Sequence, residues 1–136
     1  MILLKKYALQ FVGIPYRYGG ATPMGGLDCS GFMQILLRSC GIDPPGDQSA
    51  QALFDYFCIY GMRDKYACGA LAFFGKDGKN ISHIGMLLDQ YRMIHAAGGD
   101  STVKTIDDAI GKEAFIKIDL VKYRKDLLAV IRPDYS

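Results

Sequence analysis

The side chain best placed for chemistry is the thiol of Cys29, which stands at a turn directly before an apolar segment. The segment from Ser30 has apolar residues at helical spacing, so it predicts a helix that begins beside the cysteine. Unpaired N–H groups and the positive end of the helix dipole favour a thiolate, the nucleophilic form of cysteine. A plainer interpretation also fits, in which Asp28 or Ser30 caps the helix beside a small buried cysteine.

A nucleophilic cysteine needs a base, and the chain has two histidines, His83 and His95, twelve positions apart in a predicted hairpin. If the turn centres on Asp89, His83 lies directly opposite His95 on one face of the sheet, with Cβ atoms about 5 Å apart. A turn shifted by one residue sends the two rings to opposite faces. Gly85 and Ala97 share the histidine face, and their small size leaves room for the end of a helix.

This arrangement would suit nucleophilic catalysis. His83 would hold the Cys29 thiolate as an ion pair and then donate its proton to a leaving amine. A third polar group must fix the orientation and tautomer of that imidazole, and His95 fits this role. The alternative is two unrelated histidines, one partly buried and one on the surface.

The elements that must position these residues are helices first and strands second, which predicts an α+β domain with an antiparallel sheet. The predicted helices are Ile2–Val12, Ser30–Cys40 and Gln48–Tyr60, the last capped by Asp47. The predicted strands are Ala70–Phe74, Ile81–Leu88, Arg92–Ala97, Val103–Ile106, Phe115–Val121 and Leu127–Arg132, with a helical turn at Asp107–Ile110.

Length and composition restrict the class of protein. A chain of 136 residues with a net charge of +2 and no basic cluster predicts one domain that does not bind nucleic acid. No apolar stretch reaches the roughly 18 residues of a membrane span, and the order of apolar and charged residues at the N-terminus is not that of an export signal. Cys40, Cys58 and Cys68 are expected to be buried free thiols, and no metal or cofactor is predicted.

Four blocks of sequence resemble the NlpC-type cysteine peptidases, papain-like enzymes that cut peptide stems of the bacterial cell wall. The blocks are Gly13-Ile14-Pro15-Tyr16-Arg17-Tyr18-Gly19-Gly20, Asp28-Cys29-Ser30-Gly31-Phe32, Ser82-His83-Ile84-Gly85-Met86 and Met93-Ile94-His95-Ala96. The resemblance covers roughly residues 3 to 132. It implies N-terminal helices packed on a central antiparallel sheet of about five to six strands, and one catalytic domain over residues 1–136 without a separate targeting or wall-binding domain.

The resemblance also implies a Cys29–His83–His95 triad, with the Tyr16 hydroxyl near the cysteine. In relatives that cut after the first two stem residues, the positions of Asp28 and Ser30 bind a free stem amine. Two family features are missing here. Gly69-Ala70-Leu71 stands where an aspartate often follows the glycine, and Gly46-Asp47-Gln48-Ser49 stands where an Arg-Thr-Ser run is common. These departures leave substrate choice open.

The expected function is a cysteine endopeptidase that hydrolyses an amide bond in peptidoglycan stem peptides, between γ-D-glutamyl and a diamino acid. One alternative keeps the triad in a cytosolic amidase or acyltransferase acting on small γ-glutamyl or acyl compounds. Another is a non-catalytic metal-binding or structural module. We expect a protein that is cytoplasmic as synthesised, or associated with a virion, with phage tail or other delivery proteins as partners.

Overall fold

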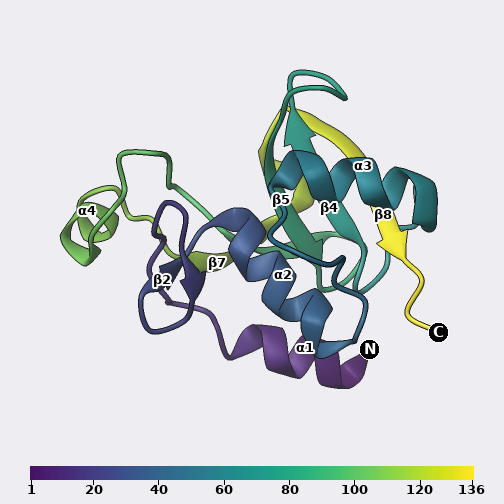
Figure 1. Ribbon diagram of the computed structural model, residues 1–136, viewed down its shortest axis with the longest axis horizontal. Helices are drawn as coiled ribbons and strands as arrows, with labels where there is room; N and C mark the ends of the chain where they lie inside the picture. The colour runs from purple at the N-terminus through teal and green to yellow at the C-terminus, as the bar shows by residue number, and fades with distance from the viewer.

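The computed structural model describes residues 1–136 and contains four α-helices and two antiparallel sheets (Figure 1). The helices are α1 (Ile2–Leu9), α2 (Cys29–Ser39), α3 (Ala50–Tyr60) and α4 (Ile106–Gly111). The larger sheet has the strand order β3-β8-β4-β5-β6-β7. Its strands are β3 (Gly61–Arg63), β4 (Leu71–Gly75), β5 (Ile81–Leu87), β6 (Arg92–Ala96), β7 (Ile116–Leu120) and β8 (Leu127–Pro133). The α+β class and the antiparallel sheet of about six strands are confirmed.

Side-chain caps decide where the helices begin. The Gly31 amide donates to Asp28 Oδ1 at 2.7 Å, which starts α2 one residue earlier than predicted. The Ala52 amide donates to the Ser49 hydroxyl at 3.1 Å, so Ser49 caps α3. The predicted cap at Asp47 is wrong, because that carboxylate instead accepts a hydrogen bond from Gln34 at 3.1 Å.

Five of the six predicted strands are present, with bounds that differ by at most one residue. The predicted strand Val103–Ile106 is absent, because Thr105 forms a capping box with Asp108 and starts α4. α1 ends at Leu9 and not at Val12, and the turn that follows brings the Gly13 amide to the Ile116 carbonyl at 2.8 Å. The short strands β1 (Ala21–Thr22), β2 (Gly26–Leu27) and β3 have no signal strong enough to be read from sequence.

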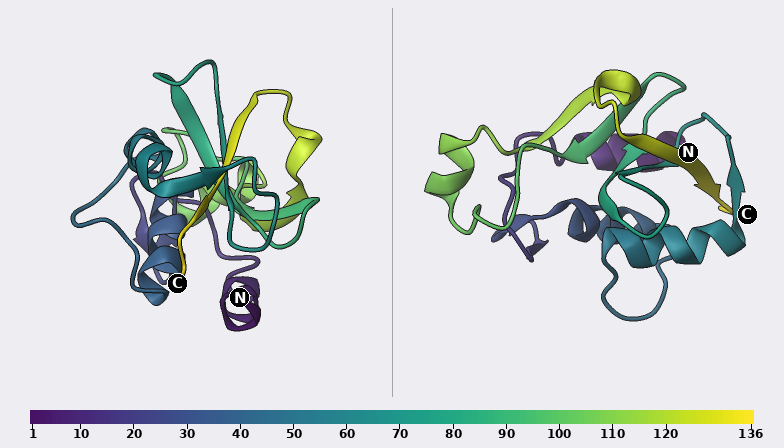
Figure 2. Two further views of the ribbon diagram at one scale, coloured as in Figure 1. Left: turned by 90° about the vertical axis from the view of Figure 1, so that its right-hand side faces the viewer. Right: turned by 90° about the horizontal axis from the view of Figure 1, so that it is seen from above.

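The core lies on both faces of the larger sheet. α2 and α3 bury their apolar faces against one side, where Phe32, Leu36 and Phe73 are fully buried, and α1 packs against α2 (Figures 1 and 2). A smaller cluster that includes Phe74 and Met93 lies on the other side. Each such large side chain contributes roughly 1.5–3 kcal/mol when it leaves water. This packing fixes α2 against β5 and β6, and therefore fixes where its first residue lies.

α4 stands apart from the body of the molecule within the long excursion between β6 and β7, as Figure 1 and the right view of Figure 2 show. The excursion is tied back to the N-terminal loop by backbone hydrogen bonds, among them Tyr18 N–H to Val103 O at 2.7 Å and Tyr16 N–H to Ala114 O at 2.9 Å. None of the four helices is both long and apolar enough to cross a membrane.

Candidate active site

Asp28 holds the start of α2 with both oxygens of its carboxylate. Oδ1 accepts hydrogen bonds from the Gly31 amide at 2.7 Å and from the Ser30 hydroxyl at 3.3 Å, and Oδ2 accepts from the Gly19 amide at 3.1 Å. A Cβ at Gly31 would run into the Gly20 carbonyl, so the loop lies directly on the first helical turn. One carboxylate thereby joins the glycine-rich loop to the helix that carries Cys29.

Cys29 is half-buried as a residue, and its thiol contacts the Ile84 amide of β5. Burial raises the pKa of its thiol to about 11, and the nearby Asp28 carboxylate adds to the rise, while the amides of Ile84, Ser30 and Cys29 itself oppose it. The expectation that the helix terminus leaves a thiolate is therefore wrong for the resting protein, because desolvation of the charged form outweighs the amide dipoles. The sulfur thus contacts the residue that directly follows His83 on β5.

The sulfur meets the sheet where β5 and β6 separate. These strands pair only at Met86↔Ile94 and Leu87↔Met93. The Leu88 amide donates to Arg92 O at 2.8 Å, so the even-numbered residues of β5 direct their amides towards β6. The Ile84 amide consequently points into the opening between the diverging strands. This opening is the place where the first turn of α2 approaches the sheet.

The two histidines lie on the same sheet face and contact each other. His83 Nε2 is 2.7 Å from His95 Nδ1, and the rings meet edge to face with centroids 5.0 Å apart. The predicted register is wrong by two residues. The observed pairs Met86↔Ile94 and Leu87↔Met93 set His95 across from Gly85, and not across from His83. A shift of two preserves the face of every side chain, so the rings still meet, on a diagonal.

The turn and Gly85 explain this register. Asp89 Oδ1 accepts hydrogen bonds from the amides of Tyr91 and Arg92, both at 2.8 Å, which moves the centre of the turn to Gln90. A Cβ at Gly85 would lie only 3.1 Å from the Cβ of His95. The space left by this glycine is therefore used by the second histidine, and not by the end of a helix as predicted.

Both imidazoles are buried, with exposed fractions of 7% for His83 and 0% for His95. Burial lowers the pKa of His83 well below its ordinary value, and His95 and Arg124 lower it further. Burial also lowers the pKa of His95, against the opposing effect of Asp119. Both rings are consequently neutral at pH 7, and together with the raised thiol pKa this favours a neutral thiol and imidazole over the predicted resting ion pair.

Asp119 on β7 extends the histidine pair and was not predicted. Its Oδ2 lies 2.8 Å from Nε2 of His95. The pairs Met93↔Asp119 and His95↔Lys117 place this carboxylate diagonally across from the second histidine. The only signal in the sequence is an acidic residue in a strand that alternates apolar and polar residues. The register of β7 against β6 cannot be read through the long excursion that joins them.

The outer side of the ring pair is covered by residues 121–126, which we call the covering segment. The Tyr123 ring lies edge-on to His95 with centroids 5.6 Å apart. The Arg124 guanidinium stands 5.0 Å from the centre of the Phe74 ring, and that ring in turn packs against His83. Arg124 is held in place by two hydrogen bonds to Asp126, at 2.9 and 2.7 Å.

The predicted substrate residues gather around the first turn of α2. The buried Tyr16 ring lies flat against Gly99, where any Cβ would collide with it. Burial raises the pKa of the Tyr16 phenol, and charges on Cys29, Asp28 and Asp100 add to the rise. A cavity of about 180 Å³ borders the same turn and is lined by Asp28 and Ser30, among others.

The profile of the NlpC/P60 family matches residues 13–119. This chain belongs to the NlpC/P60 family. It is 34% identical over 105 residues to a bifunctional muramidase/DL-endopeptidase, CwlT, of Bacillus subtilis, which covers 75% of this chain and 30% of that protein. It is 31% identical over 126 residues to a γ-D-glutamyl-L-lysine dipeptidyl-peptidase of Bacillus subtilis, which covers 90% of this chain and 37% of that protein.

The NlpC/P60 fold is equally clear in three dimensions. A lipoprotein-like member of this family from Staphylococcus aureus superposes with a TM-score of 0.70 at 24% identity, over 96% of this chain and 40% of that one. The chain thus spans about a third of the length of the two Bacillus relatives. The resemblance drawn from the four sequence blocks is confirmed, and so is the fold that it implied.

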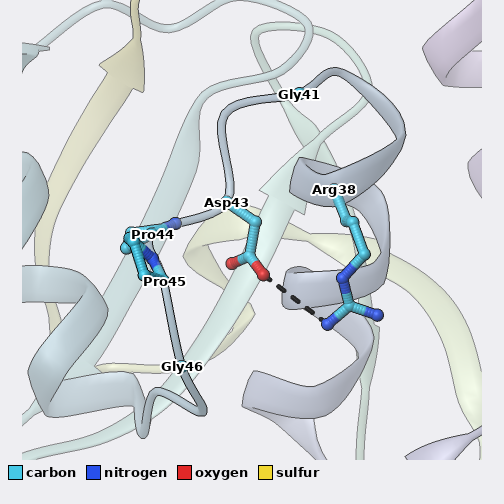
Figure 3. Close-up of a pocket in the computed structure, with 6 residues that line it drawn as sticks. All are labelled: Arg38, Gly41, Asp43, Pro44, Pro45 and Gly46. Carbon is cyan, nitrogen blue, oxygen red and sulfur yellow. Dashed lines mark ion pairs between the residues drawn. The ribbon is translucent and has the colours of Figure 1, made fainter.

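One further hollow of this NlpC/P60 chain lies towards the other end of α2 from the sulfur. Its volume is about 410 Å³, and Arg38 pairs there with Asp43 at 3.5 Å (Figure 3). The six lining residues are Arg38, Gly41, Asp43, Pro44, Pro45 and Gly46. Arg38 is nine residues along α2 from Cys29, a separation of roughly 13 Å at the rise of an α-helix. The described residues also hold no group of three or more His, Cys, Asp and Glu side chains arranged to bind a metal ion, which gives no support to the metal-binding alternative.

Proposed function

We propose that this protein is a cysteine peptidase that hydrolyses an amide bond in peptidoglycan stem peptides. Cys29 is the nucleophile, His83 the general base and His95 the group that orients it. The observation that carries the proposal is the 2.7 Å contact between the two buried imidazoles, together with a helix-tip sulfur that accepts a hydrogen bond from the Ile84 amide, one residue along β5 from His83. The Bacillus relatives named for endopeptidase and γ-D-glutamyl-L-lysine peptidase activity support the substrate class.

The proton route follows from the two rings. Nε2 of His83 is engaged with His95, so Nδ1 is the nitrogen left for the thiol. As the sulfur attacks the carbonyl carbon, the S–C bond forms and the thiol proton passes to Nδ1. The C–N bond then breaks, and His83 gives that proton to the leaving amine. Water, deprotonated by His83, hydrolyses the thioester, which releases the acid and restores the thiol.

The negative oxygen formed during attack lies at the start of α2. The first amides of a helix have no partner within the helix, so the Cys29 amide is suited to donate to this oxygen. The hydroxyl of Tyr16 is the second donor that we propose, because charges on Cys29 and Asp28 act on this phenol. Because the resting thiol and imidazole are both neutral, charge develops only during attack, which is when such donors stabilise it most.

The bond we propose is the one between γ-D-glutamyl and the diamino acid, with a free stem amine held by Asp28 and Ser30. Both side chains line the cavity of about 180 Å³ at the start of α2. Burial raises the pKa of the Asp28 carboxyl, whereas the hydrogen bonds from Gly31, Ser30 and Gly19 oppose the rise. An ammonium group placed here would add a further favourable contact to a carboxylate that is only partly compensated.

The test is cleavage of defined muropeptides followed by mass spectrometry. We expect the purified protein to cut the stem after its second residue, and Cys29→Ala to leave the substrate intact with an unchanged fold. Cys58→Ala is the matched control, since that thiol contacts Arg63 at 3.1 Å on another part of the molecule. Identical product profiles from wild type and Cys29→Ala would refute the proposal. Transfer of an acyl group to an added amine would instead favour an acyltransferase.

A further inference from the structure

The hydrogen-bonded chain of imidazoles does not end at the second histidine. His95 is engaged at both ring nitrogens, through Nδ1 to His83 at 2.7 Å and through Nε2 to Asp119 Oδ2 at 2.8 Å. The His95 ring has no exposed surface, while the Asp119 side chain is 31% exposed. Three side chains from three adjacent strands, β5, β6 and β7, therefore form one continuous line from the site to the protein surface.

The protonation of this line follows from its far end. An ionised carboxylate only accepts hydrogen bonds, so Nε2 of His95 must carry a proton. A neutral imidazole carries one proton, so Nδ1 of His95 is an acceptor and Nε2 of His83 must be the donor to it. His83 is then left with a bare lone pair on Nδ1. This is the form that can accept the thiol proton, and the opposite tautomer cannot.

We propose that Asp119 is a positioning residue that sets the tautomers of both histidines and thereby keeps His83 competent as a base. The inference rests on the proposed function, since it names the group that holds the proposed base in its active form. Asp119 touches neither the sulfur nor the substrate cavity in the structure, so it acts only through His95. It extends the expected triad to a line of four residues.

No other charged group can replace this carboxylate. Lys117 lies across from His95 on β7, but its ammonium group donates to the Glu113 carbonyl at 3.2 Å. Arg124 is paired with Asp126 by two hydrogen bonds, and as a cation it disfavours charge on both rings. Tyr123 meets His95 with its ring edge. Among the groups that face the two histidines, Asp119 is therefore the one acceptor that reaches Nε2.

The informative variant is Asp119→Asn, which keeps the shape of the side chain. An amide can turn its NH₂ towards Nε2 of His95, and this stabilises the tautomer with the proton on Nδ1. That proton then faces Nε2 of His83 and moves the remaining proton of His83 to Nδ1, which blocks the base. We expect kcat/KM on the muropeptide to fall by about 100-fold, less than the roughly 10⁴-fold loss seen when the direct partner of a triad imidazole imposes the wrong tautomer, because Asp119 acts on His83 only through His95. Asp119→Glu should recover part of the loss.

Two measurements separate positioning from a merely structural role. The first is the protonated nitrogen of each histidine, read from two-bond ¹H–¹⁵N correlation spectra of the full chain at pH 7. We expect protons on Nε2 of both rings in wild type and on Nδ1 in Asp119→Asn. The second is the pH profile of Cys29 alkylation by iodoacetamide, which needs no substrate. Loss of the base should shift this profile to higher pH in Asp119→Asn.

Asp107→Asn is the matched control, because it removes an equal charge from the exposed first turn of α4. Unchanged tautomers and an unchanged alkylation profile in Asp119→Asn, with wild-type melting, would overturn the inference while leaving the peptidase proposal intact. Failure of the wild type to cut any muropeptide would instead remove the proposed function, and the spectra would still decide the role of Asp119 in the tautomers. Equal changes in the alkylation profile and the tautomers for Asp107→Asn and Asp119→Asn would also refute the inference about Asp119.

Discussion

Gly85 offers a direct perturbation of the histidine pair that touches none of its side chains. In the observed register it lies across from His95, and a Cβ there would be 2.9 Å from Met93 Sδ and 3.1 Å from His95 Cβ. The Met93 sulfur belongs to a flexible side chain and can move. The Cβ of His95 is one bond from the backbone, and its ring is held at both nitrogens by His83 and Asp119.

The size of the effect of Gly85→Ala can be worked out from these contacts. His95 must yield by about 0.3 Å, the difference between 3.1 Å and the 3.4 Å at which ordinary contact begins. If a displacement of 1 Å lowers the rate about 100-fold, 0.3 Å lowers kcat about 4-fold when the logarithm of the rate scales with distance. Overpacking should also lower the free energy of unfolding by about 1–3 kcal/mol.

The assay combines kcat on a defined muropeptide with urea unfolding of the same preparations. Gly111→Ala is the matched control, since a Cβ at that position meets no atom within 4 Å and the residue lies at the end of α4. This control should keep its activity and gain slightly in stability, because alanine restricts the unfolded chain. Wild-type kcat and wild-type unfolding free energy in Gly85→Ala would refute the account of why a glycine stands beside His95.

Two further predictions concern stability. Burial lowers the pKa of His83 and of His95 below 6.5 in the folded state, so their contribution to stability is complete above that pH and is lost as pH falls below it, by up to about 1.4 kcal/mol per pH unit for each ring. Urea unfolding between pH 7 and 4.5 should show this loss, and a His83→Gln variant with the same slope as wild type would contradict it. Asp28→Ala removes the cap of α2 and should lower the unfolding free energy by about 1–2 kcal/mol. Asp28→Asn should keep most of that stability while raising KM for a substrate with a free amine, and an unchanged KM would restrict Asp28 to its structural role.

The start of α2 was predictable because its determinants are local. Asp28 precedes a helical pattern by one residue, and the cap needs only the three residues that follow. The shared face of His83 and His95 was also predictable, because any even shift of the hairpin register preserves it. The pairing itself was not, since the turn is centred by two hydrogen bonds from backbone amides to Asp89, and these cannot be inferred from residue types alone.

The rest of the site depends on tertiary packing. Asp119 reaches His95 only because β7 adds to the edge of the sheet after an excursion of some twenty residues, and no periodicity carries a register across such a distance. The pKa of the Cys29 thiol was expected to fall and instead rises, because its burial depends on how closely α2 approaches the separating strands. A helix terminus can be located from sequence, whereas the polarity of its surroundings cannot.

The covering segment over the histidine rings has a consequence for how the proposed peptidase could be tuned. Tyr123 and Arg124 contact the rings or their neighbours, yet neither lines the cavity at Asp28 and Ser30. The residues that affect the basicity of the histidines and the residues that line the proposed substrate cavity therefore come from separate segments of the chain. Substitutions at these two positions are expected to shift the pH range in which the proposed peptidase works without changing the shape of the cavity proposed to select its substrate, so the two properties can evolve independently.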